Sequence, residues 1–130
     1  MKAATVAAYM DASGTWTLDT DLFYHEWPDS VTGAYDDCTV VRQYGGSPPD
    51  HGFEGGVDQR PGIQVTCRSK TPSTAEANID AAFTLLDGAK FTQGSTSVYM
   101  MHANQSPFYL GKDDAGRLLF VCNFSTVTTR

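Results

Sequence analysis

Apolar and polar residues alternate most clearly in the last quarter of the chain, from Ser106 to Arg130. Alternation with a period of two indicates an extended strand with one face toward a core. Between 117 and 128, one face carries the apolar residues Leu118, Phe120, Cys122 and Phe124. Gly and Asp residues between 111 and 116 supply turn chemistry after a first arm at Phe108–Leu110. The pattern therefore predicts a β-hairpin at this end of the chain.

The same alternation predicts strands at Cys38–Tyr44, Pro61–Lys70 and Thr96–Asn104, and a short extended segment at Leu22–Tyr24. The stretch from Gly45 to Gln59 is rich in Gly and Pro and shows almost no periodicity. Long segments of this kind are usually functional or mobile. We expect the two strands on either side of it to pair antiparallel, with this stretch as a flap at their tip.

Two segments have the spacing of an amphipathic helix. Residues 3–13 place Ala3, Val6, Ala7 and Met10 on one side, and Gly14 ends this helix. The second helix is predicted to begin with a capping box, in which Ser73 is the N-cap and Glu76 the third helical residue. Its apolar stripe consists of Ala75, Ile79, Ala82, Phe83 and Leu86. Gly88 is the predicted end.

The order of these elements predicts an α+β fold, with an antiparallel or mixed β-sheet, two helices on one face and a long β-hairpin flap. At 130 residues the chain has the size of a single domain, taken here as residues 1–130. The core is predicted from the shared apolar faces: Val40, Ile63, Val65, Ile79, Phe83, Leu86, Leu118, Phe120 and Phe124.

The net charge of −6 argues against a protein that grips nucleic-acid phosphate, which requires clustered Lys and Arg. The charge is unevenly distributed. Residues 1–59 hold ten acids and two bases, a balance of −8, whereas residues 60–130 hold seven bases and five acids, a balance of +2. One interpretation is head-to-tail association of copies; the other is that both halves are ordinary solvated surface.

The three cysteines, Cys38, Cys67 and Cys122, lie at alternating positions inside predicted strands. Their odd number, the lack of a CxxC pair and this placement predict buried free thiols in a reducing, cytosolic compartment. The apolar run at the start is too short for a signal peptide. No stretch approaches 18 apolar residues, so no membrane partner is expected.

Only one set of side chains resembles a catalytic or metal-binding group: His25, Asp50, His51 and Glu54. His51 and Glu54 are three residues apart, but the Gly-rich stretch around them is poorly suited to hold ligands rigidly. The sequence has no phosphate-binding loop and no motif for an activated nucleophile. We therefore expect no enzyme activity and no cofactor; a small enzyme or metal-binding protein that uses these four residues is the alternative.

Four sequence blocks together resemble a known family: Asp21–Asp29 (DLFYHEWPD), Tyr44–Asp50 (YGGSPPD), Arg60–Lys70 (RPGIQVTCRSK) with a following helix that ends in Leu85–Gly88, and Gln105–Arg130. Their order and spacing are similar to those of the tail terminator proteins of long-tailed bacteriophages, also described as minor capsid or head–tail joining proteins.

The resemblance implies a small α+β subunit of the virion that forms a ring, usually of six copies, on the end of the tail tube. Such a ring is assembled in the host cytoplasm, stops growth of the tube protein and presents a surface to the head connector, or stopper. The genomic DNA passes through its hole without specific binding, and an acidic lumen would repel phosphate and let the DNA slide. Another head–tail connector subunit, a stopper or an adaptor, is the alternative within this class.

The flap is predicted to be the assembly element of such a subunit. The candidate contact residues to a neighbouring subunit or to the tube are Tyr44, Pro48, Pro49, Asp50, Phe53, Glu54, Val57, Asp58 and Arg60. Arg60 is expected to pair with an acid of the partner, and Phe53 to fill a pocket on it. The alternative is a surface loop of no consequence.

Overall fold

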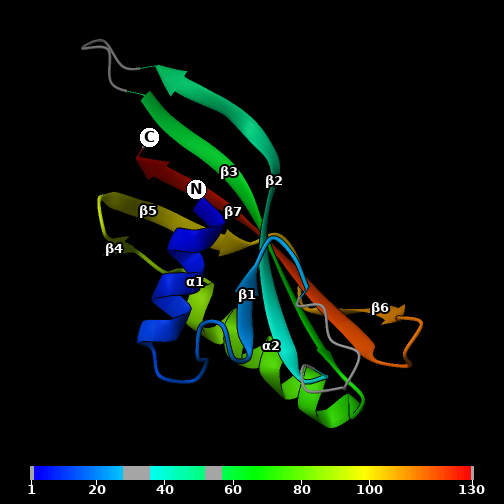
Figure 1. Cartoon of the computed structure of the whole chain (residues 1–130). Helices are drawn as coiled ribbons and strands as arrows, with labels where there is room; N and C mark the ends of the chain where they lie inside the picture. The colour runs from blue at the N-terminus through cyan, green and yellow to red at the C-terminus, as the bar shows by residue number, and fades with distance from the viewer. Residues whose placement is uncertain (1, 28–35, 52–56, 130) are drawn as a thin grey trace.

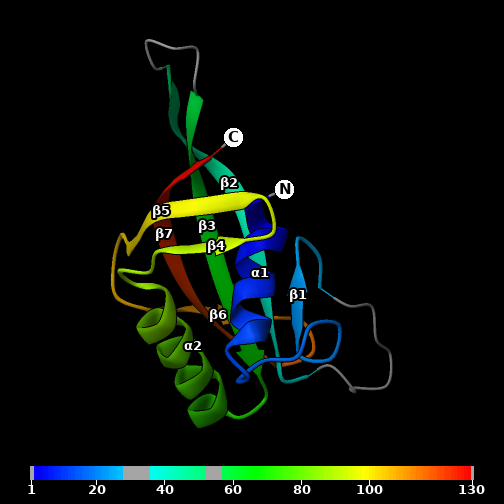
Figure 2. The same ribbon diagram turned by 90° about the vertical axis from the view of Figure 1, so that its left-hand side faces the viewer.

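In the computed structural model, which describes residues 2–27, 36–51 and 57–129, seven strands form one curled sheet and both helices pack on one of its faces (Figures 1 and 2). The elements in chain order are α1 (Lys2–Ala12), β1 (Leu22–Tyr24), β2 (Cys38–His51), β3 (Val57–Ser69), α2 (Pro72–Leu86), β4 (Phe91–Gln93), β5 (Thr96–Ala103), β6 (Phe108–Lys112) and β7 (Leu118–Thr129). The predicted α+β class is confirmed.

The sheet has the strand order β1-β2-β3-β7-β5-β4, and β6 pairs with β7 beside this path. All pairs are antiparallel except β1 with β2, which makes the sheet mixed. The predicted hairpin at the end of the chain is present as β6 and β7. The sequence pattern missed β4, a strand of three residues that contains only one large apolar side chain, Phe91.

The prediction of a long irregular flap from Gly45 to Gln59 is wrong in extent, because β2 continues to His51 and β3 begins at Val57. Ser47 lies opposite Arg60 in the ladder, and the register shifts twice between Tyr44 and Asp50. Such bulges interrupt the alternation that marks a strand, which is why the sequence pattern failed here. The paired segments 45–51 and 57–60, called the arm below, project beyond the rest of the sheet (Figures 1 and 2).

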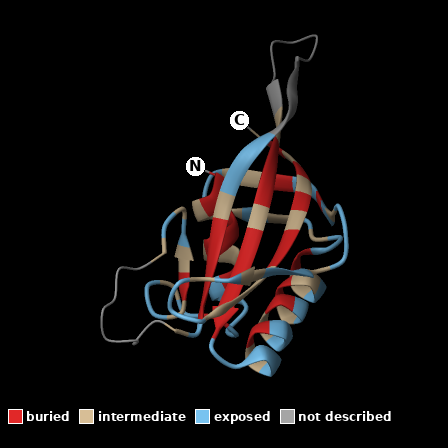
Figure 3. Cartoon of the chain, turned by 90° about the vertical axis from the view of Figure 1, so that its right-hand side faces the viewer, coloured by how far each residue is buried: buried red, intermediate tan, exposed pale blue. Residues whose placement is uncertain are grey.

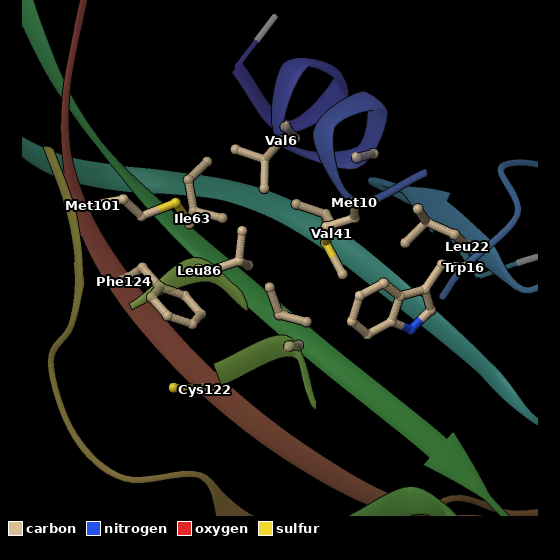
Figure 4. Packing of buried hydrophobic residues seen from close by; sticks show 14 of the residues in the cluster. Val6, Met10, Trp16, Leu22, Val41, Ile63, Leu86, Met101, Cys122 and Phe124 are labelled. Carbon is tan, nitrogen blue, oxygen red and sulfur yellow. The ribbon is translucent and has the colours of Figure 1, made fainter. Parts of the chain in front are cut away.

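The core lies between the two helices and the sheet (Figure 4). The buried side of α1 consists of Ala3, Val6, Ala7 and Met10, and that of α2 of Ala75, Ile79, Ala82 and Leu86, as the spacing predicts. The sheet contributes Val41, Ile63, Val65, Met101, Cys122 and Phe124, among others. None of the described helices is long and apolar enough to cross a bilayer.

Three of the predicted core positions are less buried than predicted, and a fourth, Val40, is buried as predicted but on the other face of the sheet. Val40 is fully buried but lies outside the main cluster, which contains its neighbour Val41 instead. Both faces of β2 are therefore covered at this point. Figure 3 shows buried residues along much of the central strands. Phe83, Leu118 and Phe120 are only half-buried, and Phe83 and Phe120 pack against the core cluster.

The predicted capping box of α2 is wrong. The helix begins at Pro72, its N-cap is Thr71, and Thr71 makes no side-chain capping hydrogen bond. A residue before proline is restricted to extended backbone, and Thr71 has φ −101° and ψ 117°. Proline at the first helical position then starts the helix, since its φ is already helical. Ser73 consequently lies inside the first turn.

Candidate functional site

The face of the sheet that points away from the helices contains a hollow of about 200 Å³ at the base of the arm. Its lining comes from β2, β3, β5 and β7 and from the residue that follows β5: Tyr44, Arg60, Pro61, Gly62, Met100, His102, Asn104, Ser125, Thr126 and Val127. Ile63 belongs to the core, so its neighbour Gly62 faces the opposite side of the strand. We refer to this side as the outer face.

Tyr44 forms one wall of the hollow, and its ring lies directly on Gly62, where any side chain would overlap it. The Asn104 amide donates a hydrogen bond to the Tyr44 hydroxyl (3.3 Å), and the Ser125 hydroxyl donates to the Asn104 side-chain oxygen (2.6 Å). This chain of bonds fixes the ring to β7. A lone glycine inside a strand pattern is the sequence signal for such a close approach.

The lining of the hollow includes one Arg and no acid, in a chain that is acidic as a whole. Arg60 and His102 contribute to its lining, and none of the lining residues is Asp or Glu. Ligand pockets in proteins usually have about 300–1,000 Å³, so a hollow of this size suits a single side chain better than a free ligand. Its chemistry, cationic and hydroxyl groups beside Met100 and Val127, fits a side chain with an apolar body and a polar or acidic tip.

The structure places the nine predicted contact residues in three groups. Tyr44 and Arg60 lie at the base of the arm and both line the hollow. Five others belong to the ladder of the arm by their backbone positions: Pro48, Pro49, Asp50, Val57 and Asp58. Asp50 lies opposite Asp58 in this ladder. Phe53 and Glu54 lie outside the described residues. The hairpin of β2 and β3 thus contains most of the predicted contact residues. His102 of β5 and Asn104, the residue after β5, lie beside Tyr44 and Arg60 in the lining of the hollow.

The structure does not assemble the alternative metal or catalytic group. The His25 backbone N–H donates to the Val41 carbonyl (2.8 Å), near the start of β2. Asp50 and His51 lie at the other end of that strand, roughly 30 Å away at the usual rise per residue. Glu54 is outside the described residues, and the rest of the described chain contains no group of three His, Cys, Asp or Glu that could hold a metal.

A second feature of the outer face escaped the sequence analysis. The guanidinium carbons of Arg42 and Arg68 lie 5.2 and 4.2 Å from the centre of the Trp27 ring. Arg42 Nε also donates to the His25 carbonyl (3.0 Å). Burial, together with the nearby charge of Arg68, lowers the pKa of Arg42. These stacked groups hold the segment after β1 against the sheet and explain why both faces of β2 are covered.

The cysteines are free and buried, as predicted. Burial raises the pKa of the Cys67 thiol to about 12 and that of Cys122 to about 11, and it also raises the pKa of Cys38. A thiol with a raised pKa remains protonated and unreactive at neutral pH. The cysteines are therefore packing residues.

The projecting hairpin and the side-chain-sized hollow at its base form a candidate surface for contact with another protein. Comparison with known proteins identifies the family of this chain. Residues 9–130 match the family described as "Bacteriophage tail terminator protein", and the chain belongs to this family. It is a structural protein of the phage tail, as the sequence resemblance indicates.

A solved structure shares the fold. A chain in the structure titled "Virion of native gene transfer agent (GTA) particle" superposes with a TM-score of 0.64 at 15% identity, over 99% of this chain and 96% of that one. At this identity the likeness supports the fold alone. A search of curated proteins gives no match.

Proposed function

We propose that six copies of this chain form a ring on the end of a tail tube, stop growth of the tube and join the tail to the head connector. The observation that carries this proposal is the family match over residues 9–130. Such a role needs contact surfaces and no chemistry, and it requires neither a cofactor nor a membrane. The subunit is assembled in the host cytoplasm and remains in the neck of the virion.

The arm and the hollow are the proposed contact site with a neighbouring subunit or the tube protein. The arm projects from the sheet, so it reaches a partner without disturbing the core (Figure 2). Arg60 and Tyr44 at its base offer a cationic and an aromatic contact, which are the residue types enriched in binding hot spots. The remaining members of the proposed set are Pro48, Pro49, Asp50, Phe53, Glu54, Val57 and Asp58.

The proposed ring passes the genomic DNA without binding it specifically. The net charge of −6 supports this, because a surface of the same sign as phosphate repels the DNA and does not hold it. The acidic residues of the first half are the ones we expect to face the lumen or a partner subunit.

The test is the length of tails assembled in cells that make all phage proteins except this one. Electron microscopy should show tubes of uncontrolled length that are not joined to heads, and expression of the chain in trans should restore a single length. Tails of normal length that merely fail to join heads would instead identify a connector subunit, either a stopper or an adaptor. Normal, joined tails would refute both assignments.

A further inference from the structure

The pairing of the sheet is interrupted at the base of the arm. On the β2 side the register with β3 shifts between Tyr44 and Gly46, so Gly45 is an extra residue on its strand. On the β3 side the register with β7 continues from Gln59 to Gly62 across Pro61, which has no N–H to donate to a ladder. A junction of this kind would let the arm change direction relative to the sheet unless other contacts hold it.

The first contact that holds this junction lies on the outer face. The Tyr44 ring rests on Gly62, and the Tyr44 hydroxyl accepts a hydrogen bond from the Asn104 amide (3.3 Å). Asn104 is itself fixed to β7. Its backbone N–H donates to the Asn123 carbonyl (2.8 Å), and its side-chain oxygen accepts from the Ser125 hydroxyl (2.6 Å). The last residue of β2 before the bulge is thus tied to β7.

The second contact comes from the two ends of the described chain. Asp58 of the arm pairs with Thr129, the last residue of β7. The Lys2 ammonium donates to the Thr129 carbonyl, and the Ser97 N–H donates to the Thr129 hydroxyl (3.0 Å). The Lys2 backbone N–H donates to the Gln43 side-chain oxygen (3.2 Å). Lys2 therefore connects β2 with the strand end that pairs with the arm, and Figure 1 shows the start of α1 and the end of β7 near the arm.

The burial of Lys2 is unusual for a charged side chain. Lys2 is only 8% exposed, and this burial lowers its pKa. Lysine is rarely buried unless its ammonium is hydrogen-bonded, because removal of a charge from water costs free energy. A methionine of similar length would fill the same space without that cost. Packing alone therefore does not require a lysine here, and its bond to Thr129 points to a role in placing the end of β7.

We propose that Tyr44 and Lys2 are positioning residues that hold the arm in one direction relative to the sheet before any partner binds. Tyr44 fixes β2 on the outer face, and Lys2 fixes the end of β7 with which β3 of the arm pairs. A contact site that is already in place loses less conformational entropy on association. The consequence for assembly rests on the proposed function, which makes the arm a contact site, whereas the direction of the arm can be measured without it.

The distance between the arm and the rest of the protein tests this inference. Spin labels are placed on Ser47→Cys in the arm and on Glu76→Cys at an exposed position of α2. Double electron–electron resonance then measures their separation at a concentration at which the chain sediments as a monomer. The native cysteines are buried and should not take the label at neutral pH. We expect one narrow distance distribution in the otherwise wild-type chain and a clearly broader one when Tyr44→Ala and Lys2→Met are combined.

A matched control and two further measurements separate positioning from overall stability. Tyr99→Ala with Lys90→Met removes the same two side-chain types at exposed positions, and its distance distribution should stay narrow. The melting temperature of Lys2→Met should stay the same or rise, because an apolar side chain replaces a buried charge. A broader distribution in that variant therefore reports the arm and not a weakened core. The double variant should also need a roughly tenfold higher concentration for half-assembly.

The outcomes separate the inference from the proposed function. Distributions of equal width in the wild-type background and in the double variant would overturn the inference, whether both are narrow or both broad. A broader distribution with unchanged assembly would support the positioning role and remove the arm from the proposed contact site. If the double variant does not fold, Tyr44→Phe and Lys2→Met are measured singly, since each removes one hydrogen bond and keeps most of the side chain. Each should broaden the distribution, and no change in either would overturn the inference.

Discussion

Gly62 shows how one residue type can shape a surface. A Cβ at this position would overlap the Tyr44 ring, whereas a Cβ at Gly45 would meet nothing within 4 Å. We therefore expect Gly62→Ala to displace the ring, break its hydrogen bond with Asn104 and cost about 1 kcal/mol of unfolding free energy. Denaturant unfolding measures this, with Gly45→Ala as the matched control. Equal stability of the two variants would show that the ring does not depend on the glycine.

The buried thiols predict a defined pH dependence. The Cys67 pKa rises from 9.0 to about 12 on folding, so below pH 9 both the folded and the unfolded chain keep this proton. Above pH 9 the unfolded chain loses the proton first, and the stability contributed by the neutral thiol falls as the pH rises toward 12. Unfolding curves between pH 8 and about 11 should show the loss of stability, and Cys67→Ala should make stability fall less steeply with pH.

The burial of all three thiols also predicts their reactivity. A thiol reagent at neutral pH should label three groups per chain in denaturant and almost none in the native protein. Fast labelling of the native protein would contradict this burial.

At the scale of elements, the turn between β6 and β7 is held by one ionic group. Arg117 Nε lies 2.7 Å from Asp113 Oδ2, and its Nη1 lies 3.6 Å from Asp36, two residues before β2. Burial acts to raise the pKa of Asp113, but hydrogen bonds from the Arg117 backbone and side chain outweigh it and lower the pKa. The turn between β6 and β7 is therefore tied to the segment that precedes β2.

Asp113→Ala should loosen this turn and cost about 1–2 kcal/mol, since it removes hydrogen bonds to a charged group. Asp114→Ala, at an exposed neighbouring position, should cost almost nothing. Because the pKa of Asp113 is lowered, its contribution is present above the ordinary value of 3.8 and is lost as the pH falls through the folded value. Thermal melts at neutral and acidic pH measure both effects. Identical melts of the two variants would mean that the turn is not held by these bonds.

At the scale of the whole molecule, we expect the arm to contribute little to the stability of the fold. Its paired strands project beyond the rest of the sheet (Figures 1 and 2). Replacing residues 46–56 with a short Gly-Ser linker should leave the melting temperature almost unchanged, because a change of loop length costs little. Ring assembly and control of tail length should be lost, as electron microscopy of complemented tails would reveal. Normal tails would remove the arm from the contact site, and an unfolded chain would place it in the core.

The local pattern by itself determined the α+β class, the apolar sides of both helices and the main strands of the sheet, because these depend on periods of two and 3.6 residues within one element. Where a local rule met a competing one it failed: Pro72 moved the start of α2, and bulges hid the strands of the arm. The single-domain assignment stays a prediction.

Other features depended on residues that are distant in the sequence. Only the tertiary structure brings Tyr44, Arg60, His102 and Ser125 to one hollow, stacks Trp27 on two arginines, and excludes His25 from the neighbourhood of Asp50. The physical reason is that sequence periodicity says which face of a strand a side chain occupies, whereas strand order and register decide which faces meet.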